Sequence, residues 1–419
     1  MIVNVIDDRM GRSKTSAMIE YMKKYSNQKK FIFVTPFLDE VERVKKSCGF
    51  IEPLPSDRFK NKTECFKDLM LSNISIVTTH SLFKSLDEES IDILREKDYV
   101  LVLDEVLDVV SETSLTETSL TALVDLKILK ILEDGNIVAG EEEVLRKYVG
   151  DWEYEEIINN LLRKNLEFYR SYENKSKGKK YALMWLFPID LLKSFDEIFI
   201  LTYCFDGYPL KSFLDLHGIK QQKFSVEVIN PEAEYEDRQY KFVPYFLRSN
   251  KDIKDKVKVL DGNVINNIGE ENGAFSMTWY SNKFTKNELG TQLRKNLLNV
   301  ACKRFKNNKI KDILWTTFKN KIVSLTNEKL KDSNYIPHNL RATNEYRDRT
   351  SLIYLVNRNY NPVIYQWFKG KGITVDEKTF AIGEMCQWVW RSAIRDNKEI
   401  EIYIPSSKMR TLFIEWLNQ

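Results

Sequence analysis

The sequence contains little that would support a disulfide scaffold, a zinc centre or a membrane anchor. Its five cysteines are scattered without CxxC spacing, and its three histidines lie far apart. We therefore expect free thiols in a reducing cytoplasm and no zinc site. Asp7 and Asp8 interrupt the apolar start, and no apolar run is long enough to cross a bilayer, so neither a signal peptide nor a spanning helix is expected.

A surplus of one charge is also nearly absent. The chain has 64 basic and 61 acidic residues, which gives a net charge of only +3. This balance neither indicates nor excludes nucleic-acid binding, because a basic stripe on one face would suffice. With 43% hydrophobic and 30% charged residues over 419 positions, the composition is that of a globular protein with two to three domains.

The start of the chain combines a strand, a polar loop and a helix. Residues 1–6 form a short apolar run, residues 7–15 are polar, and residues 16–22 have helical spacing. This order, with Lys-Thr at the helix start, is typical of a phosphate-binding P-loop. We expect ATP to be bound by Gly11, Arg12, Ser13, Lys14 and Thr15, with Lys14 on the phosphates and Thr15 on Mg²⁺.

The match to the P-loop pattern is incomplete. Two positions that are glycine in G-x-x-x-x-G-K-[ST] are Asp8 and Ser13 in this chain. A serine held in the left-handed backbone region costs about 1 kcal/mol. The alternative is that Lys14 simply opens an ordinary helix after a turn.

A second chemical feature ends a buried strand. Residues 99–103 are apolar and run directly into Asp104 and Glu105. Acids at the carboxyl end of a parallel strand lie at the edge where α/β proteins bind ligands. We expect Asp104 to complete the Mg²⁺ shell and Glu105 to orient or deprotonate the attacking water. The alternative is a strand that ends in a solvated acidic turn.

These segments, residues 11–15 and 104–107, resemble motifs I and II of the DExx-box helicases of superfamily two. Other segments follow in that family's order: residues 31–40 (motif Ia), 75–80 (Ib or Ic), 198–204 (III), 313–318 (IV), 339–345 (V) and 387–395 (VI). The chain is most similar in character to divergent helicase-like proteins of bacteriophages and prophages.

The resemblance implies an α/β protein with two RecA-like P-loop domains and a helical insertion in the first. The expected parts are residues 1–111 with 196–210 for domain one, 112–195 for the insertion and 211–419 for domain two. ATP and Mg²⁺ would bind between the domains. Catalytic roles are implied for Glu105, Gln387, Arg391 and Arg395. The alternative for residues 387–395 is an amphipathic helix in which Trp388 and Trp390 pack and the arginines face solvent, although Trp-x-Trp cannot place both indoles on one helical face.

Nucleic-acid contacts are expected at short polar residues that follow strands. The candidates are Thr35, Pro36, Thr78, Thr79, His80, Thr316 and Arg341. Hydroxyls there suit phosphate contacts that carry no sequence information. Ordinary helix capping by Thr35 and Thr79 is the alternative, and both roles are compatible.

About ninety residues separate the strand at 99–104 from the strand at 198–202, more than a simple connection requires. Helical spacing at residues 116–133 and 141–172 predicts an inserted helical module. Its basic turn, with Lys175, Lys177, Lys179 and Lys180, fits either a nucleic-acid clamp or a solvated hairpin. Residues 206–231 are expected to link the domains. Strands are expected at 240–247, 274–280, 312–317, 351–356 and 399–404, with helices at 286–307 and 408–417.

Three functions are compatible with these features. The favoured one is an ATP-hydrolysing helicase or translocase in phage DNA replication or recombination, acting in the host cytoplasm on DNA more than RNA, with phage or host replication proteins as partners. The second is a non-motor regulator that binds nucleic acid or protein on a degenerate helicase scaffold, favoured by Ser13 and by the altered motif III at residues 198–204. The third, a small-molecule P-loop kinase or GTPase, is disfavoured by the absence of an N-K-x-D pattern and by the long carboxyl half.

Overall fold

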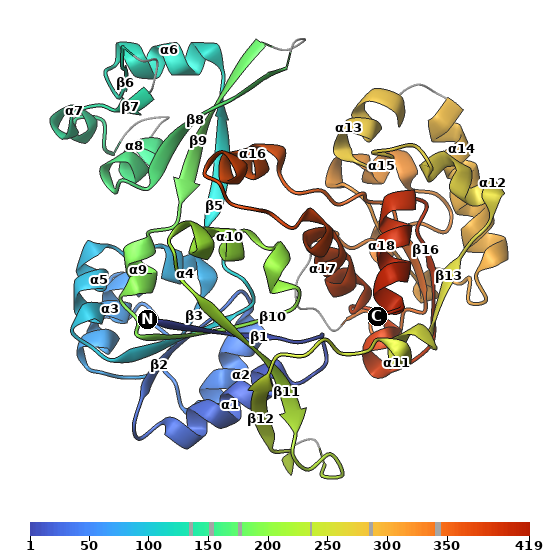
Figure 1. Ribbon diagram of the computed structural model, residues 1–419, viewed down its shortest axis with the longest axis horizontal. Coiled ribbons are helices and arrows are strands. Elements are labelled where there is room, and N and C mark those ends of the chain that lie inside the picture. Colours follow the sequence, from blue (N-terminus) through green and yellow to red (C-terminus); the bar gives the residue numbers. More distant parts are fainter. Residues whose placement is uncertain (134–136, 151–154, 175–177, 235–236, 285–287, 340–344) are drawn as a thin grey trace. The chain divides into compact units, whose positions relative to one another are not determined.

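The computed structural model describes residues 1–133, 137–150, 155–174, 178–234, 237–284, 288–339 and 345–419 (Figure 1). The chain forms two compact units. The first contains Met1–Asp7, Thr15–Phe242 and Asn361–Val375, and the second contains Asp8–Lys14, Val243–Tyr360 and Asp376–Gln419. The loop Asp8–Lys14 thus groups with the second unit although it joins two elements of the first.

The first unit is built on a seven-stranded sheet of order β12-β11-β1-β10-β4-β2-β3. The strands are β1 Ile2–Asp7, β2 Lys30–Thr35, β3 Ile76–Thr79, β4 Tyr99–Asp104, β10 Glu197–Thr202, β11 Gln221–Val228 and β12 Tyr240–Pro244. Neighbouring strands from β11 to β3 pair in parallel. The carboxyl ends of these strands therefore lie at one edge of the sheet.

Helices cover both faces of this sheet, as the nearly continuous apolar strands require. They are α1 Lys14–Tyr25, α2 Leu38–Cys48, α3 Lys62–Leu71, α4 His80–Lys84, α5 Glu88–Arg95, α9 Ile189–Lys193 and α10 Pro209–Leu216. Side chains alternate between faces along each strand. Phe31 and Phe33 of β2 pack in one core cluster with Met18 and Met22 of α1 and Val44 of α2.

The stretch where a helical insertion was expected contains strands as well as helices. Its described residues form the antiparallel sheet β5-β9-β8, the antiparallel pair β6 and β7, and the helices α6, α7 and α8. The bounds are β5 Val110–Leu115, α6 Glu117–Asp125, β6 Leu129–Ile131, β7 Ile137–Ala139, α7 Glu142–Arg146, α8 Glu155–Leu162, β8 Leu166–Asn174 and β9 Gly178–Leu186. The helix predicted up to residue 172 ends at Leu162, since the aromatic run of β8 pairs with β9. Residues 175–177, part of the expected basic turn, lie outside the described residues.

Two boundaries differ from the sequence predictions. The first unit continues past residue 211, because β11 pairs with β1, with Val3 beside Gln221 and Ile6 beside Phe224. The predicted linker at 206–231 therefore contains α10 and β11. In addition, α16 (Pro362–Gly370) packs against β5 and β8, and Lys371 Nζ lies 2.5 Å from Glu167 Oε1.

The second unit has a four-stranded parallel sheet of order β13-β16-β15-β14. Its strands are β13 Val257–Leu260, β14 Ile313–Thr316, β15 Ser351–Tyr354 and β16 Ile400–Tyr403. Its helices are α11 Lys251–Lys254, α12 Asn263–Asn266, α13 Met277–Trp279, α14 Glu288–Asn299, α15 Ile322–Leu325, α17 Glu377–Val389 and α18 Ser407–Leu417. Residues 274–280, predicted to be a strand, contain α13 and begin a π-helical turn at Tyr280.

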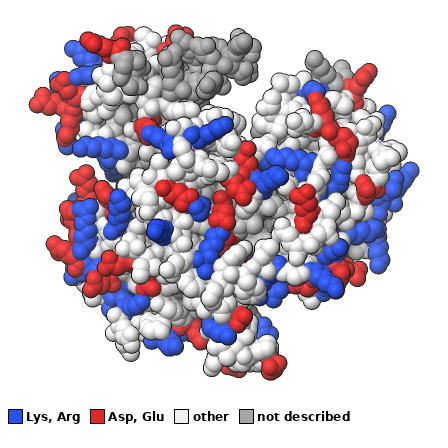
Figure 2. Space-filling model, in the orientation of Figure 1, with Lys and Arg blue, Asp and Glu red and all other residues white. Residues whose placement is uncertain are grey.

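Short helical turns complete the two units. Turns of 3₁₀ type occupy Phe205–Gly207, Asn267–Gly269, Ile310–Asp312, Lys319–Lys321, Asp332–Asn334 and Ala393–Asp396, and π-helical turns occupy Tyr280–Phe284 and Val300–Arg304. Basic and acidic side chains are interspersed on the face shown in Figure 2, in line with the net charge of +3.

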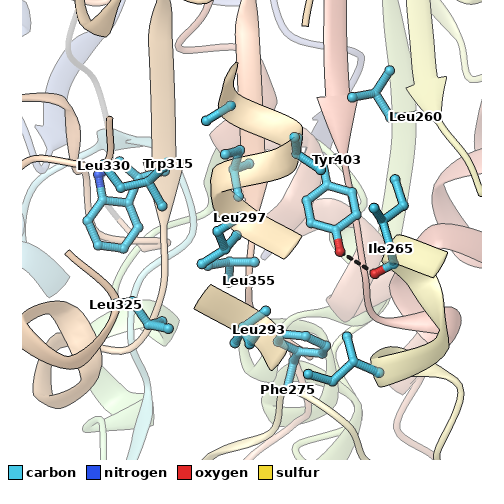
Figure 3. Packing of buried hydrophobic residues seen from close by; sticks show 14 of the residues in the cluster. Leu260, Ile265, Phe275, Leu293, Leu297, Trp315, Leu325, Leu330, Leu355 and Tyr403 are labelled. Carbon is cyan, nitrogen blue, oxygen red and sulfur yellow. Dashed lines mark hydrogen bonds between the residues drawn. The ribbon is translucent and has the colours of Figure 1, made fainter. Parts of the chain in front are cut away.

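The core of the second unit packs α14 against the sheet (Figure 3). Leu293 and Leu297 of α14 lie with Trp315 of β14 and Tyr403 of β16 in one buried cluster. The Tyr403 hydroxyl donates a hydrogen bond to the backbone oxygen of Ile265 at 2.5 Å. This bond satisfies the one polar group that the ring brings into the apolar cluster.

Replacement of Tyr403 by phenylalanine is expected to lower the free energy of unfolding of this unit by about 1 kcal/mol. The loss is small because the Ile265 oxygen still accepts a bond from Asn296 Nδ2 at 3.2 Å. Urea denaturation followed by tryptophan fluorescence would measure it. Tyr365→Phe on the half-exposed part of α16 is the control, and equal losses in both variants would contradict a specific role for the buried bond.

Candidate nucleotide site

The carboxyl edge of the first sheet carries polar residues on adjacent strands. Asp7 ends β1, Thr202 ends β10, Asp104 ends β4 and Thr35 ends β2. All four are buried, and the pairing register places Asp7 beside Thr202 and Asp104 beside Leu201. Buried polar residues clustered at this edge are typical of ligand sites in α/β proteins.

Asp104 is the centre of the arrangement. Thr15 Oγ1 donates to Asp104 Oδ1 at 3.1 Å, and Thr35 Oγ1 donates to Oδ2 at 3.2 Å. Burial is the main cause that raises the pKa of Asp104 to about 7, and the negative charges of Glu105 and Glu40 raise it further. The hydrogen bonds from the two threonine hydroxyls lower the pKa and so oppose this shift in part. A carboxylate in these surroundings is stabilised in its charged form by a cation.

Glu105 is held in an unusual backbone conformation. Its φ of 71° lies in the left-handed region, which is costly for a residue with a side chain. The backbone N–H donates to the Leu201 oxygen at 2.9 Å, so the strain is fixed by the neighbouring strand. Its Oε2 atom is buried and makes no hydrogen bond to the described residues. Backbone strain and unsatisfied buried polar atoms are both more frequent at functional sites than elsewhere in proteins.

The loop before α1 has two residues in the left-handed backbone region. Gly11 has φ 78° and Ser13 has φ 58°, so Ser13 occupies the left-handed region that the sequence suggested. Lys14 Nζ lies across the loop and donates to the backbone oxygens of Asp8 at 2.6 Å and Arg9 at 3.3 Å. Backbone N–H groups at the start of α1 add the positive end of the helix.

The donor set fits a nucleotide with Mg²⁺. A threonine hydroxyl and a carboxylate are hard oxygen ligands of the kind Mg²⁺ prefers, and Mg²⁺ usually takes its other ligands from phosphate and water. Among the described residues, no group of three or more His, Cys, Asp or Glu side chains could hold a metal.

Asp7 was not among the predicted site residues. Its Oδ1 accepts from the Cys204 N–H at 2.8 Å and its Oδ2 from the Phe205 N–H at 3.2 Å. It therefore fixes the turn that follows β10, where Cys204 has φ 59°. The sequence feature that could have identified Asp7 is an acidic residue at the end of the first strand.

Two of the three predicted residues near the end of α17 are buried. Gln387 is 5% exposed and Arg391 is 8% exposed, whereas Arg395 is exposed on the 3₁₀ turn Ala393–Asp396. The structure therefore does not place Arg395 in the buried setting that Gln387 and Arg391 share. The helix ends at Val389, which changes the direction of the chain before Arg395.

The two tryptophans of this segment have separate surroundings, as the Trp-x-Trp spacing predicted. Trp388 packs on Tyr354 with ring centroids 5.3 Å apart, and Trp390 packs on Trp416 at 5.8 Å. Trp390 also meets the loop: a Cβ added at Gly11 would lie 3.7 Å from its Nε1. A glycine at position 11 therefore suits both the backbone conformation and this neighbour.

The predicted nucleic-acid residues that the structure describes are either buried or partly exposed. Thr35, Thr78 and Thr316 are buried, which contradicts the expected contacts of their hydroxyls with nucleic acid. The Thr35 hydroxyl instead donates a hydrogen bond to Asp104. Thr79 accepts the Leu82 N–H at 3.4 Å and so caps α4, which was the alternative role. Pro36 and His80 are partly exposed after β2 and β3. Arg341 lies outside the described residues.

Comparison with known proteins assigns the chain to a family. The family described as "YonV C-terminal Rossmann-like domain" matches residues 251–417. A relative described as the SPbeta prophage-derived uncharacterized protein YonV of Bacillus subtilis (strain 168) is 35% identical over 428 residues, which cover 99% of this chain and 98% of the relative. The chain belongs to the YonV family. The parallel sheets of both units confirm the predicted α/β class for this member of it.

Solved structures with detectable likeness to this YonV-family chain are remote. One titled "XPD_Helicase" is 11% identical with a TM-score of 0.44, and the match covers 99% of this chain and 94% of that one. Another, titled "Structure of S. tokodaii Xpd4", is 12% identical with a TM-score of 0.43, covering 99% and 93%. Within the described ranges, no helix is long and apolar enough to cross a membrane.

Proposed function

We propose that this YonV-family protein is an ATP hydrolase of the helicase or translocase type, stimulated by nucleic acid. The observation that carries the proposal is the buried Asp104 carboxylate between the hydroxyls of Thr15 and Thr35, beside the strained Glu105. The prophage origin of the relative YonV supports a role in phage DNA replication or recombination. The same proposal interprets the two sheets as the central sheets of two RecA-like domains.

The roles of the residues follow from their chemistry. Lys14 holds phosphate by charge and hydrogen bonds, and the α1 N-terminus adds backbone donors. Thr15 and Asp104 hold Mg²⁺, which when bound offsets the negative charge of the phosphates. Glu105 accepts a proton from the attacking water, or orients it, through its buried carboxylate oxygen.

Residues at the end of α17 would complete the chemistry. Arg391 would stabilise charge that develops on the transferred phosphate, and Gln387 would position water or sense that phosphate. Contacts to nucleic acid are assigned to Pro36, Thr79 and His80, with the backbone of the neighbouring strand ends and helix N-termini. DNA is proposed as the preferred polymer, with phage or host replication proteins as partners.

A second candidate is a non-motor regulator that binds nucleotide or nucleic acid without turnover. The left-handed Ser13 and the exposed Arg395 favour it, since both depart from a complete catalytic set. It shares the nucleotide site with the first proposal and differs from it in hydrolysis.

The test is ATP hydrolysis by the full chain alone and with single-stranded DNA, duplex DNA or RNA. We expect turnover that rises with DNA and disappears in Lys14→Ala, because Lys14 lies across the loop that would hold the phosphates. The matched control is Lys23→Ala, an exposed lysine on the same helix. ATP binding without turnover under every condition would contradict the motor and favour the regulator.

A further inference from the structure

The loop that carries Gly11, Ser13 and Lys14 begins with two buried charged residues. Asp8 is 3% exposed and Arg9 is 4% exposed. Buried charges are costly unless they are paired and hydrogen-bonded. Their partners come from a short stretch, residues 248–252, at the start of α11 in the same unit.

Both charges are paired in bidentate geometry. Arg248 donates from Nε to Asp8 Oδ1 at 2.8 Å and from a terminal nitrogen to Oδ2 at 2.9 Å. Arg9 donates to the two carboxylate oxygens of Asp252 at 3.0 and 2.6 Å, and to Asn250 Oδ1 at 3.0 Å. We name these five residues, Asp8, Arg9, Arg248, Asn250 and Asp252, the loop clamp. Fork-to-fork pairs of this kind fix direction as well as distance.

The clamp is anchored in packed structure. Asn250 is 2% exposed and its Nδ2 donates to the backbone oxygen of Trp416 in α18 at 2.8 Å. The Arg9 guanidinium lies 5.8 Å from the Trp390 ring centre, and Trp390 packs edge-on against Trp416. The start of the loop is therefore held by the helix α18 and the end of α17.

The clamp acts on the atoms that position Lys14. Lys14 Nζ donates to the backbone oxygens of Asp8 and Arg9, the two residues whose side chains are clamped. The loop must also keep Ser13 at φ 58° without the glycine that adopts this conformation freely. Fixing one end of a short loop limits the conformations into which Ser13 could relax.

We propose that Arg248 and Asp252 are positioning residues that hold the loop Asp8–Lys14 in its phosphate-binding form, in place of the missing glycines. This inference rests on the proposed nucleotide site. It assigns the affinity of that site for phosphate to ion pairs made by residues about 240 positions away in the sequence. Arg12 also reaches the clamp, since its Nη2 atom lies 3.3 Å from Asp252 Oδ2 while its side chain is 40% exposed.

The first test measures amide hydrogen exchange of residues 9–16 in the full chain without nucleotide. Arg248→Ala and Asp252→Ala are expected to speed exchange about 10- to 100-fold, the range for losing a hydrogen bond to a charged group. Asp255→Asn, an exposed acid that follows the same helix, is the control and should leave the rate unchanged. Unchanged exchange in both clamp variants would overturn the inference.

The second test measures affinity for a fluorescent ATP analogue in the same variants. Weaker binding by about 10- to 100-fold is expected, with recovery when Ser13→Gly is added to Asp252→Ala, because glycine adopts the left-handed conformation without strain. Simple unfolding would not be rescued by a glycine, so failure of rescue would contradict positioning. If the natural protein bound no nucleotide while exchange rose as expected, the clamp would stand and the proposed function would fail.

Discussion

Replacement of Glu105 by glutamine is expected to lower ATP turnover about 10²- to 10⁴-fold while nucleotide binding is retained. The amide keeps the size of the side chain and cannot accept a proton from water. The backbone strain at φ 71° is unaffected by the change, so the residue should stay in place. Nucleotide binding should not suffer, since loss of the Glu105 charge also removes one of the causes that raise the pKa of Asp104.

The measurement is steady-state hydrolysis of ATP together with binding of a fluorescent analogue. Asp108→Asn, three residues further on, is the matched control, because the Asp108 side chain is 80% exposed. Turnover that survived in Glu105→Gln would contradict the role given to this carboxylate. A parallel loss of binding and turnover would indicate that Glu105 holds the site together and does not act on water.

Arg391→Ala is expected to lower turnover by about 10³- to 10⁵-fold, the range found for arginines that stabilise a transferring phosphate. The residue is buried and directly follows Trp390, which lies against Gly11 of the loop. Arg391→Lys keeps the charge but loses the planar fork, so partial activity is expected.

Arg395→Ala is the control that shows whether the loss of turnover is specific to Arg391. Arg395 is exposed on a 3₁₀ turn, so its loss should change turnover little. Thermal unfolding of each variant separates loss of chemistry from loss of structure. A larger effect for Arg395 than for Arg391 would contradict the assignment drawn from burial.

Several parts of the fold and site were accessible from local sequence. The apolar strands at residues 2–7 and 99–104 are recognisable because buried parallel strands are continuous apolar runs. The left-handed conformation of Ser13 was suggested by its place in the P-loop pattern, which usually has glycine there. Asp104 was correctly expected at the carboxyl edge because parallel strands bring their ends together.

Other parts depended on partners that are distant in the chain. Residues 166–174 carry charges at helical spacing, yet pairing with β9 makes them a strand, since sheet pairing overrides weak local preference. The Thr35 hydroxyl was expected to contact nucleic acid or to cap a helix, but the pairing of β2 with β4 brings it to Asp104. Segment 361–375 joins the first unit through packing on the insertion, which no local pattern reports.

The sequence by itself determined the chemistry that this protein can offer: a lysine and threonine opening a helix, and two acids ending a strand. These features are local, and local spacing is enough to specify them. Only the tertiary structure decided which hydroxyl meets Asp104, and that Arg391 is buried whereas Arg395 is exposed. It also decided which carboxylate pairs with Arg9, since Asp252 lies 243 positions away, and such partners are selected by packing of the whole chain.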